Sequence, residues 1–398
     1  MLDVASIRQD FPILDRQIEG KPIIYLDSAA TSLKPRQVID AVVEYYTTCT
    51  SNVRRGVHPL GDEATERYEE CRNTIAGFVG ADPREIVLVR NTTEAINLVA
   101  GSCRSDARIA YCLGDHHSNV LPWSSFPQAR AVGLLPDGAL DRDALQRLLV
   151  EHRPELLAIT HVTNAFGYVH PVEEIVQLAH RHGCKVLVDG SQSVPHRAVN
   201  VFDLECDYLC FSAHKMCGPS GIGALYGNRE ALRSLRPRIL GGSMVSEVHA
   251  AEHVLSDIPW RFEAGTPCIE GTFGFAAACD YLNGLGMDAV EAYVDELARY
   301  AVDRIRAIPS LMVYGPSDGE PRGAAITFAV PGLEAHALSR LLANRFGILV
   351  RSGFHCAQPA HEAIKSPPTV RASFYVYNTR EEIDCLADAL SGIVRHLA

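Results

Sequence analysis

The chain has 398 residues, of which 47% are hydrophobic and 21% charged, a size and composition that favour one large and one smaller domain. The formal net charge of −11 argues against a nucleic acid or an anionic membrane as the partner. No run approaches the roughly 20 apolar residues of a membrane span, and residues 1–6 show no basic region followed by an apolar one, so we expect neither a membrane segment nor a signal peptide.

The cysteines point to a reducing compartment. Twelve are scattered along the chain, and the closest pair, Cys206 and Cys210, does not have the C-x-x-C spacing of a zinc or redox site. Most lie in apolar runs, as Cys112 does, where a free cysteine usually serves as a small core residue. We therefore predict no metal site and a cytoplasmic location.

The first part of the chain predicts an arm followed by two helices. Residues 1–20 are mixed and are expected to form an arm or a short helix. A short strand is predicted over 22–27. One helix begins near Pro35, and a second covers about 64–78 and ends at Gly80. In both, apolar residues recur at spacings of three and four, which is typical of a helix with one buried face.

From there, apolar runs alternate with polar or helical segments. Strands are predicted over 86–89, 108–113, 156–160, 185–188, 208–211 and 222–226. Helices are predicted after Asn91, with Thr92 and Thr93 as caps, and over 172–181. The strands are continuously apolar, as expected for a mainly parallel sheet that helices cover on both faces.

After residue 227 the regular alternation of strands and helices ends. Residues 227–259 are expected to form an irregular connection around Gly241, and a long amphipathic helix is predicted over 288–308. Shorter units follow, with strands near 311–314, 324–328, 348–350 and 370–377 and helices over 336–345 and 381–396. We predict an α/β fold with three parts: an arm at 1–20 that joins the small domain, a large domain at 21–270, and a small α+β domain at 271–398.

Polar residues follow successive predicted strands at the point where each strand ends. They are Thr93, His116, Asn164, Asp189 with Gln192, and His214 with Lys215. In an open α/β sheet the carboxyl ends of the strands form the edge where ligands bind. The sequence therefore predicts that these groups converge on one site.

The residue types in this set indicate a particular chemistry. Lys215 lies in the glycine-rich stretch 211–223, and burial of its amine would lower its pKa and free it for Schiff-base formation; the alternative is an ordinary loop lysine. A buried Asp189 needs a partner, for which the protonated ring nitrogen of pyridoxal phosphate (PLP) is suited, although Asp189 could instead cap a helix. Thr93, Ser212 and His214 offer phosphate donors. His116 could stack on a ring or be a solvated histidine.

A second group lies in the predicted small domain. Cys356 differs from the other cysteines because its loop, 351–359, is bounded by glycine and proline and contains Arg351 and His355. Nearby positive charge raises the thiolate fraction of a cysteine. Arg371 is a candidate for binding a carboxylate through two parallel hydrogen bonds, with an ordinary salt bridge as the alternative.

Together these motifs resemble the group II cysteine desulfurases of the SufS/CsdA type, in the class V aminotransferase family of fold-type I PLP enzymes. The matching segments extend over nearly the whole chain: 26–30, 92–99, 116–123, 161–164, 188–192, 211–223, 261–267, 355–357 and 371–373. The resemblance implies a homodimer that contains PLP, takes the sulfur of L-cysteine onto Cys356 as a persulfide, releases L-alanine and passes the sulfur to an acceptor protein, for iron–sulfur cluster assembly or other sulfur biosynthesis.

The resemblance also implies residue roles. Lys215 carries PLP, Asp189 pairs with the ring nitrogen, Gln192 binds the ring hydroxyl, and His116 stacks on the ring and takes part in catalysis. The phosphate is bound by Thr92, Thr93, Ser212 and His214, with Thr266 reaching it from the other subunit. The substrate is bound by Asn164, Arg371 and Arg55.

The chain departs from the family pattern at a few positions. Phe354 stands where a second histidine commonly precedes His355 and Cys356. Arg54 stands where a histidine often precedes Arg55, and Cys217 and Cys268 are additional thiols. Three alternatives stay open at this point: a selenocysteine lyase or another C–S lyase, an aminotransferase, and a non-catalytic protein that has kept the fold. The intact set of Lys215, Asp189 and Thr93 disfavours the last.

Overall fold

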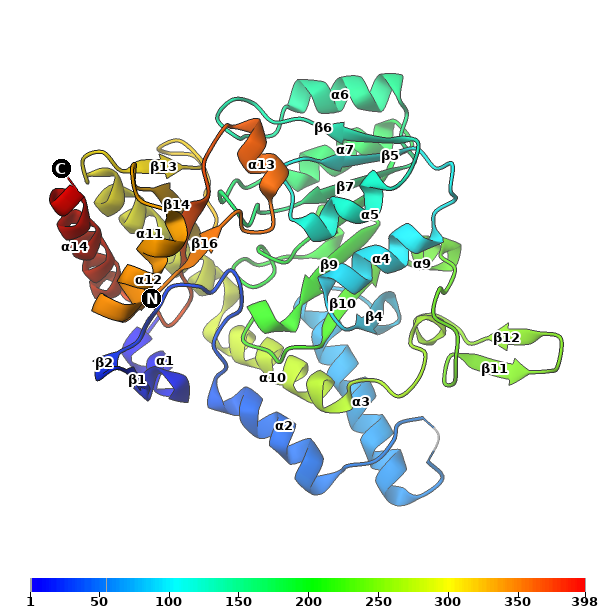
Figure 1. Ribbon diagram of the computed structural model, residues 1–398. Helices are drawn as coiled ribbons and strands as arrows, with labels where there is room; N and C mark the ends of the chain where they lie inside the picture. Colours follow the sequence, from blue (N-terminus) through cyan, green and yellow to red (C-terminus); the bar gives the residue numbers. More distant parts are fainter. Residues whose placement is uncertain (1, 55, 398) are drawn as a thin grey trace.

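A seven-stranded sheet forms the centre of the computed structural model, which describes residues 2–54 and 56–397 (Figure 1). The strand order is β4-β10-β9-β8-β7-β5-β6. The strands are β4 (Ile86–Val89), β5 (Ile109–Cys112), β6 (Ala129–Val132), β7 (Leu156–Thr160), β8 (Lys185–Asp189), β9 (Tyr208–Ser212) and β10 (Gly223–Gly227). Strand β10 is antiparallel to both neighbours and the other pairs are parallel, which confirms the predicted mainly parallel sheet.

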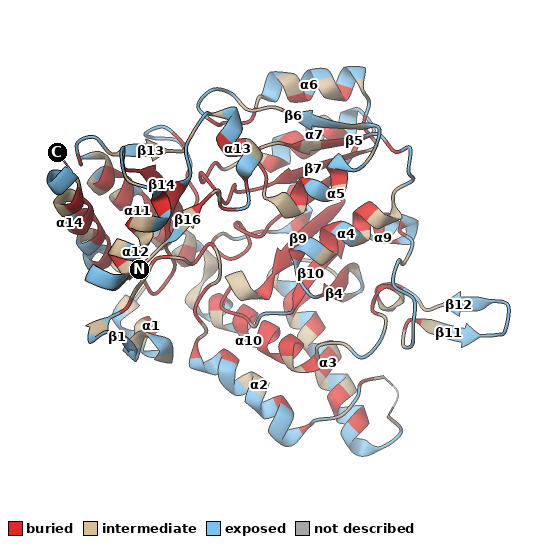
Figure 2. Ribbon diagram, viewed as in Figure 1, coloured by how far each residue is buried: buried red, intermediate tan, exposed pale blue. Residues whose placement is uncertain are grey.

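Helices cover both faces of this sheet, and its strands are largely buried except for the edge strand β6, where Arg130 and Ala131 are exposed (Figure 2). Successive side chains alternate between two cores: in β4, Ile86 and Leu88 join one core and Val87 and Val89 the other. The first core is completed by α2 (Arg36–Thr48), α3 (Pro59–Phe78), α6 (Arg142–Glu151), α7 (Val172–Arg181), α8 (Val201–Leu204) and α10 (Ile269–Leu285). The second is completed by α4 (Thr92–Ser102), α5 (Leu121–Ser124) and α9 (Arg229–Ser234).

A separate hydrophobic core lies in the C-terminal part of the chain. Its sheet has the order β13-β14-β17-β16, with every pair antiparallel. The strands are β13 (Met312–Tyr314), β14 (Ala325–Ala329), β16 (Arg351–Gly353) and β17 (Thr369–Ser373), and the helices are α11 (Met287–Arg306), α12 (Ala335–Phe346), α13 (Gln358–Ala363) and α14 (Arg380–Leu397). This arrangement agrees with the shorter α+β units expected there.

The N-terminal segment contacts this C-terminal part. It contains α1 (Val4–Gln9), the 3₁₀ turn Pro12–Asp15 and the pair β1 (Gln17–Ile18) and β2 (Lys21–Pro22). Arg8 Nη1 donates to Glu382 Oε1 at 2.9 Å, and β3 (Ile24–Tyr25) pairs in parallel with β15 (Ile348–Leu349). These contacts agree with an arm that joins the small domain, while the domain limits themselves stay a prediction.

The sequence prediction was wrong or incomplete at several elements. Helix α10 was not predicted because it is buried on most sides, so its sequence lacks the polar face that marks an amphipathic helix. Its packing is close: a Cβ atom at Gly274 would lie 2.5 Å from Pro219 Cγ. The connection 227–259 contains α9 and the hairpin β11 (Val245–Val248) and β12 (His253–Leu255). Asn91, and not a threonine, caps α4, since its Oδ1 accepts from Glu94 N at 3.0 Å.

Within the described ranges, no helix combines the length and apolar character that crossing a membrane requires.

The packing of α10 against the sheet gives a stability prediction. Phe275 is fully buried and meets Phe211 of β9 edge to face, with the ring centroids 5.8 Å apart. Phe275→Ala should leave a cavity and lower the free energy of unfolding by about 3–5 kcal/mol, measured by urea denaturation. Phe202 is 74% exposed, so Phe202→Ala serves as the matched control, with an expected change below about 0.5 kcal/mol. Equal losses in the two variants would contradict this account.

Candidate functional site

A cavity of about 250 Å³ lies where β7, β8 and β9 end. Thr160, Asp189 and Ser212, the last residues of these strands, line it, and the C-terminal part of the chain contributes Arg351, His355, Cys356 and Arg371. The predicted site residues that line it are Thr92, Thr93, His116, Asn164, Asp189, Gln192, Ser212, His214, Lys215, Cys356 and Arg371. The structure therefore brings together the two groups that the sequence placed about 140 residues apart.

The turn that carries Lys215 is fixed by a carbonyl group. Lys215 ends the 3₁₀ turn Ala213–Lys215, directly after β9. The His214 carbonyl oxygen accepts from Ser32 N at 3.0 Å, from Thr31 Oγ1 at 2.9 Å and from Lys34 Nζ at 3.0 Å. Burial lowers the pKa of Lys215 to about 8, although the Asp189 carboxylate opposes this shift. A sizeable fraction of the amine is therefore neutral near pH 8.

A second acid that the sequence analysis missed, Asp115, lies near enough to Asp189 for the charge of Asp189 to act on it. Asp189 is 3% exposed, and its Oδ1 accepts from Ser191 N at 2.9 Å. Asp115 is fully buried and accepts from Asn119 Nδ2 at 2.7 Å and Thr160 N at 3.0 Å. Burial, reinforced by the charge of Asp189, raises the pKa of Asp115 well above its ordinary value. This shift favours the protonated form of Asp115.

Hydroxyl groups gather at the N-terminus of α4. Ser212 Oγ accepts from Thr92 N at 2.8 Å, and Ser191 Oγ donates to Thr92 Oγ1 at 2.9 Å. Thr93 Oγ1 lies 2.7 Å from Ser118 Oγ. Hydroxyls at the start of an eleven-residue helix are suited to an anion such as phosphate. Ser118 and Ser191 had no signal in the sequence beyond their places after strands.

The histidines of the cavity are neutral. Burial, together with the nearby Lys215, lowers the pKa of His116 to about 3, and His116 Nδ1 accepts from Ser118 N at 3.1 Å. Burial and Lys215 likewise lower the pKa of His214 to about 4. His214 can therefore donate a hydrogen bond but does not supply a positive charge. Gln192 Nε2 donates to the Ala29 carbonyl at 2.8 Å, which orients its side chain.

The Cys356 loop is bound to the large sheet by backbone groups. Asn164 Nδ2 donates to the His355 carbonyl at 2.6 Å, and His117 N donates to the Cys356 carbonyl at 2.7 Å. His355 and Cys356 have φ angles of 52° and 55°, which are left-handed. The Cys356 residue is exposed and also lines the cavity.

His355 does not supply the positive charge that the sequence predicted beside Cys356. His355 was expected to place positive charge beside Cys356, but burial and Arg371 lower the pKa of His355 to about 2. Its Nε2 lies 2.9 Å from Thr369 Oγ1. The cations that line the cavity with Cys356 are Lys215, Arg351 and Arg371.

Two acceptors orient the Arg371 guanidinium, and its third nitrogen, Nε, has no hydrogen-bond partner. It is 2% exposed, its Nη1 donates to the Asn164 carbonyl at 2.8 Å, and its Nη2 lies 3.4 Å from Asp27 Oδ1. Arg371 Nε and Asn164 Oδ1 are buried without a partner. Burial lowers the pKa of Arg371 to about 10, so it stays cationic at neutral pH. Asp27, which the sequence analysis did not assign, thus sets the orientation of Arg371.

Two predicted residues lie elsewhere. Thr266 is exposed and lines a groove of about 850 Å³. This groove adjoins the cavity, because Asn91 and Thr93 line both. Arg55 lies outside the described residues. Among the residues that are described, no group of three or more His, Cys, Asp or Glu is placed to hold a metal ion.

The neighbourhood of Lys215 predicts how its amine titrates. The rate of reductive methylation of Lys215, followed by peptide mass spectrometry, should rise with a midpoint near pH 8. Asp189→Asn should move the midpoint to lower pH, because the carboxylate of Asp189 is the group that raises this pKa. A midpoint above about 10, the ordinary lysine range, would contradict the proposed burial effect.

Comparisons with known proteins agree with this geometry. The aminotransferase class-V family model matches residues 24–386. The chain is 41% identical over 413 residues to a cysteine desulfurase of Haloferax volcanii, covering 98% of this chain and 96% of that protein. It is 42% identical over 406 residues to a cysteine desulfurase of Escherichia coli O127:H6, covering 99% of each.

Solved structures show the same fold. An apo cysteine desulfurase from Thermococcus onnurineus superposes with a TM-score of 0.93 at 35% identity, over 100% of this chain and 99% of that one. The S-sulfonic acid form of the Escherichia coli cysteine desulfurase CsdA gives 0.89 at 32% identity, over 100% and 99%. The family match contains every residue that lines the cavity. This chain therefore belongs to the aminotransferase class-V family.

Proposed function

We propose that this protein is a PLP-dependent cysteine desulfurase, which removes sulfur from L-cysteine, releases L-alanine and holds the sulfur as a persulfide on Cys356. The observation that carries the proposal is an exposed cysteine at the rim of a cavity that Lys215 and Asp189 also line. Relatives and structural neighbours that bear the name cysteine desulfurase cover nearly the whole chain, which supports the same conclusion.

The cavity fits PLP in its charges and donors. Lys215 supplies an amine of lowered pKa, and the buried carboxylate of Asp189 suits a protonated ring nitrogen. The hydroxyls at the start of α4 suit the phosphate. Thr92, Thr93, Ser212 and His214 would hold the phosphate, and Gln192 and the neutral ring of His116 would contact the cofactor ring. When bound, PLP would act as an electron sink for the substrate carbon next to the amino group.

The buried arginine suits the substrate carboxylate. Arg371 remains cationic and has an unpaired Nε beside the cavity, while Asn164 has an unpaired Oδ1. Binding an anion in a buried place requires such a preoriented cation. Asp27 and the Asn164 carbonyl hold the guanidinium in position before substrate arrives. Arg55 is proposed as a further contact to the substrate.

The thiol step requires Cys356 as a thiolate. Its sulfur attacks the substrate sulfur, so that one S–S bond forms while the Cβ–S bond of the substrate breaks. The electron pair of the broken bond leaves with Cβ, and a proton completes the methyl group of alanine. Lys215 has a pKa of about 8, so its amine can accept and return protons during this sequence. Lys215, Arg371 and Arg351 are the cations that line the cavity together with Cys356.

The placement of Cys356 also separates this function from its alternatives. An aminotransferase has no use for a thiol at the cavity rim, and the exposure of Cys356 leaves its sulfur accessible to an acceptor protein. Selenocysteine in place of cysteine would fit the same groups, so a selenocysteine lyase is the second candidate. We also propose a cytoplasmic location, because the sequence contains twelve cysteines scattered without a disulfide framework.

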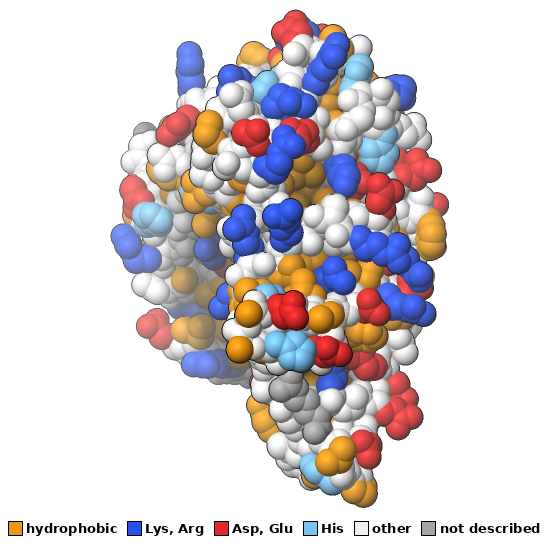
Figure 3. All heavy atoms as spheres, turned by 90° about the vertical axis from the view of Figure 1, so that its right-hand side faces the viewer, with side chains coloured by type: hydrophobic (Ala, Val, Ile, Leu, Met, Phe, Trp, Pro, Cys, Tyr) orange, Lys and Arg blue, Asp and Glu red, His pale blue; other side chains and the backbone are white. Residues whose placement is uncertain are grey.

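A second copy of this chain is the proposed occupant of the groove that contains Thr266. The groove borders the hydroxyl cluster of α4, and Ile239 and Phe262 are among its apolar lining residues. Figure 3 shows this side of the molecule, on which hydrophobic side chains lie among Lys and Arg side chains. Leu240, Val248 and Val254 are exposed by 61%, 67% and 50%. Burial of such a surface favours a homodimer in which Thr266 reaches the phosphate site of its partner.

The first test removes the thiol. Cys356→Ala should reduce alanine release from L-cysteine about a thousandfold or more, as removal of a covalent nucleophile does, while the yellow colour of bound PLP remains. Mass spectrometry of the wild type after incubation with L-cysteine should show one added sulfur on Cys356. Cys385 is also exposed and lies on α14, so Cys385→Ala is the control and should be fully active. Unchanged alanine release by Cys356→Ala would exclude the mechanism, and a keto acid product would favour an aminotransferase or an eliminating lyase.

The second test concerns the homodimer. Thr266→Ala should raise the dissociation constant of PLP about tenfold, the effect of losing one hydrogen bond to a charged group. Lys215→Ala should be colourless and inactive. A mixed dimer pairs one Thr266→Ala subunit with one Lys215→Ala subunit. If Thr266 acts across the interface, one of its two sites combines the intact Lys215 of the first subunit with the intact Thr266 of the second. Activity at low PLP concentration should therefore reappear on mixing, and its absence in verified mixed dimers would place Thr266 in its own subunit's site or in neither.

A further inference from the structure

Two buried histidines and a buried threonine form a row of hydrogen bonds next to the loop that contains Cys356. Thr369, the first residue of β17, lies between the two rings: its Oγ1 is 2.9 Å from His355 Nε2 and 3.2 Å from His361 Nε2. The other nitrogen of the second ring, His361 Nδ1, lies 3.2 Å from the Ala357 carbonyl oxygen. All three side chains belong to buried residues. We call His355, Thr369 and His361 the His–Thr–His relay.

The chemistry of the groups fixes the direction of each hydrogen bond in the relay. A carbonyl oxygen can only accept, so His361 Nδ1 carries the proton that the Ala357 carbonyl receives. Burial lowers the pKa of His361, so its ring is neutral at pH 7 and its Nε2 accepts from the Thr369 hydroxyl. The Thr369 oxygen in turn accepts from His355 Nε2. Each ring therefore has one tautomer, and His355 Nδ1, which has no partner, has no proton.

The relay is attached to the residues on both sides of Cys356. His355 precedes Cys356 and supplies one ring, and Ala357 follows it and supplies the carbonyl oxygen. His355 and Cys356 have left-handed φ angles of 52° and 55°, which residues other than glycine keep only when their contacts hold them. Both neighbours of Cys356 are buried, whereas Cys356 itself is exposed and lines the cavity. The relay thus fixes the two residues between which the thiol is presented.

Aromatic side chains surround the second ring of the relay and offer it no other hydrogen bond. Phe354 meets His361 edge to face with the ring centres 5.4 Å apart, and the centre of the Phe166 ring lies 4.7 Å from that of His361. Phe354 stands where the resembled desulfurases commonly have a second histidine. A histidine there would bring a further donor and acceptor beside the relay. Phenylalanine has neither, so the hydrogen bonds of His361 stay within the relay.

We propose that His361 and Thr369 are positioning residues that hold Cys356 in place for attack on the substrate sulfur. This inference rests on the proposed desulfurase function and adds two residues that do not line the cavity. They act through His355 and Ala357. Loss of the relay leaves ring nitrogens buried without partners, and the His355 ring recovers a hydrogen bond only by moving, which displaces Cys356. The relay therefore determines the rate of sulfur transfer to Cys356 and not the affinity for L-cysteine or PLP.

The test compares Thr369→Val, which replaces the hydroxyl by a methyl group, with Thr369→Ser, which keeps the hydroxyl, in the full-length enzyme loaded with PLP. For Thr369→Val, we expect the single-turnover rate of sulfur transfer to Cys356 to fall about 10- to 100-fold, as displacement of a reacting group by about 1 Å does. Rapid quenching followed by peptide mass spectrometry measures this rate. Thr369→Ser should recover about half of the wild-type rate or more, because its hydroxyl can make the same bonds. The dissociation constant of L-cysteine, titrated through PLP absorbance in the Cys356→Ala background, should change less than about twofold in both variants.

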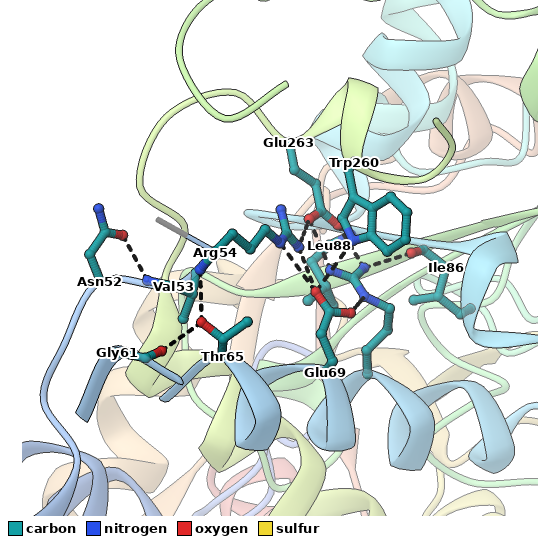
Figure 4. Close-up of polar contacts among 11 residues, drawn as sticks. Asn52, Val53, Arg54, Gly61, Thr65, Glu69, Ile86, Leu88, Trp260 and Glu263 are labelled. Carbon is teal, nitrogen blue, oxygen red and sulfur yellow. Dashed lines mark hydrogen bonds and ion pairs between the residues drawn. The ribbon is translucent and has the colours of Figure 1, made fainter. Parts of the chain in front are cut away.

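Thr65 provides a matched control, because its hydroxyl also joins two groups (Figure 4). It donates to the Gly61 carbonyl at 2.7 Å and accepts from Arg54 N at 2.8 Å. Thr65 lies on α3 and does not line the cavity. Thr65→Val therefore removes a bridge of the same kind, and we expect it to leave the rate of sulfur transfer to Cys356 unchanged.

Three results would overturn the proposal: an unchanged transfer rate in Thr369→Val, an equal fall in Thr65→Val, or a Thr369→Ser variant as slow as Thr369→Val. Should Thr369→Val fail to fold, His361→Phe takes its place, because phenylalanine keeps the aromatic packing of the ring but removes both nitrogens. The same fall in rate is expected there, and an unchanged rate has the same meaning. Failure of the wild type to take sulfur onto Cys356 would instead refute the proposed function.

Discussion

The site depends on a clamp across the chain: the Asn164 side chain donates to the His355 carbonyl, 191 residues away. Arg371 completes this clamp by donating to the Asn164 carbonyl. These bonds bring a loop of the C-terminal part against the carboxyl edge of the large sheet. Together with the bond from His117 N to the Cys356 carbonyl, they place the lysine and the thiol in one cavity.

Burial of the cavity between the two parts of the chain also determines the protonation states of its histidines. Removing water from the cavity lowers the pKa of each buried histidine, so His116, His214 and His355 are neutral. Burial and the charge of Asp189 likewise raise the pKa of Asp115 well above its ordinary value. The site also contains an ion pair between oppositely charged side chains, Asp27 and Arg371. The site thus contains few charges in fixed places, which is what recognition of a zwitterionic substrate requires.

The sequence was sufficient for much of the fold and for most of the lining of the cavity. Strands such as β4 and β7 match the predicted ranges because buried parallel strands are continuous apolar runs bounded by polar residues. Helix α10 was missed because burial on most sides removes the helical period. Asp27 and Asp115 were missed, and His355 was given the wrong charge, because their roles arise from burial and from partners distant in sequence. Local residue patterns do not contain that information.

The two left-handed residues of the thiol loop narrow which amino acids could ever occupy position 356. At a φ of 55°, a branched Cβ clashes with the adjacent backbone. Of the three small nucleophiles that proteins use, threonine is therefore excluded by conformation, whereas serine would fit the backbone yet lack a sulfur to share. The backbone conformation of this turn therefore limits which amino acids can replace Cys356, independently of any requirement for reactivity.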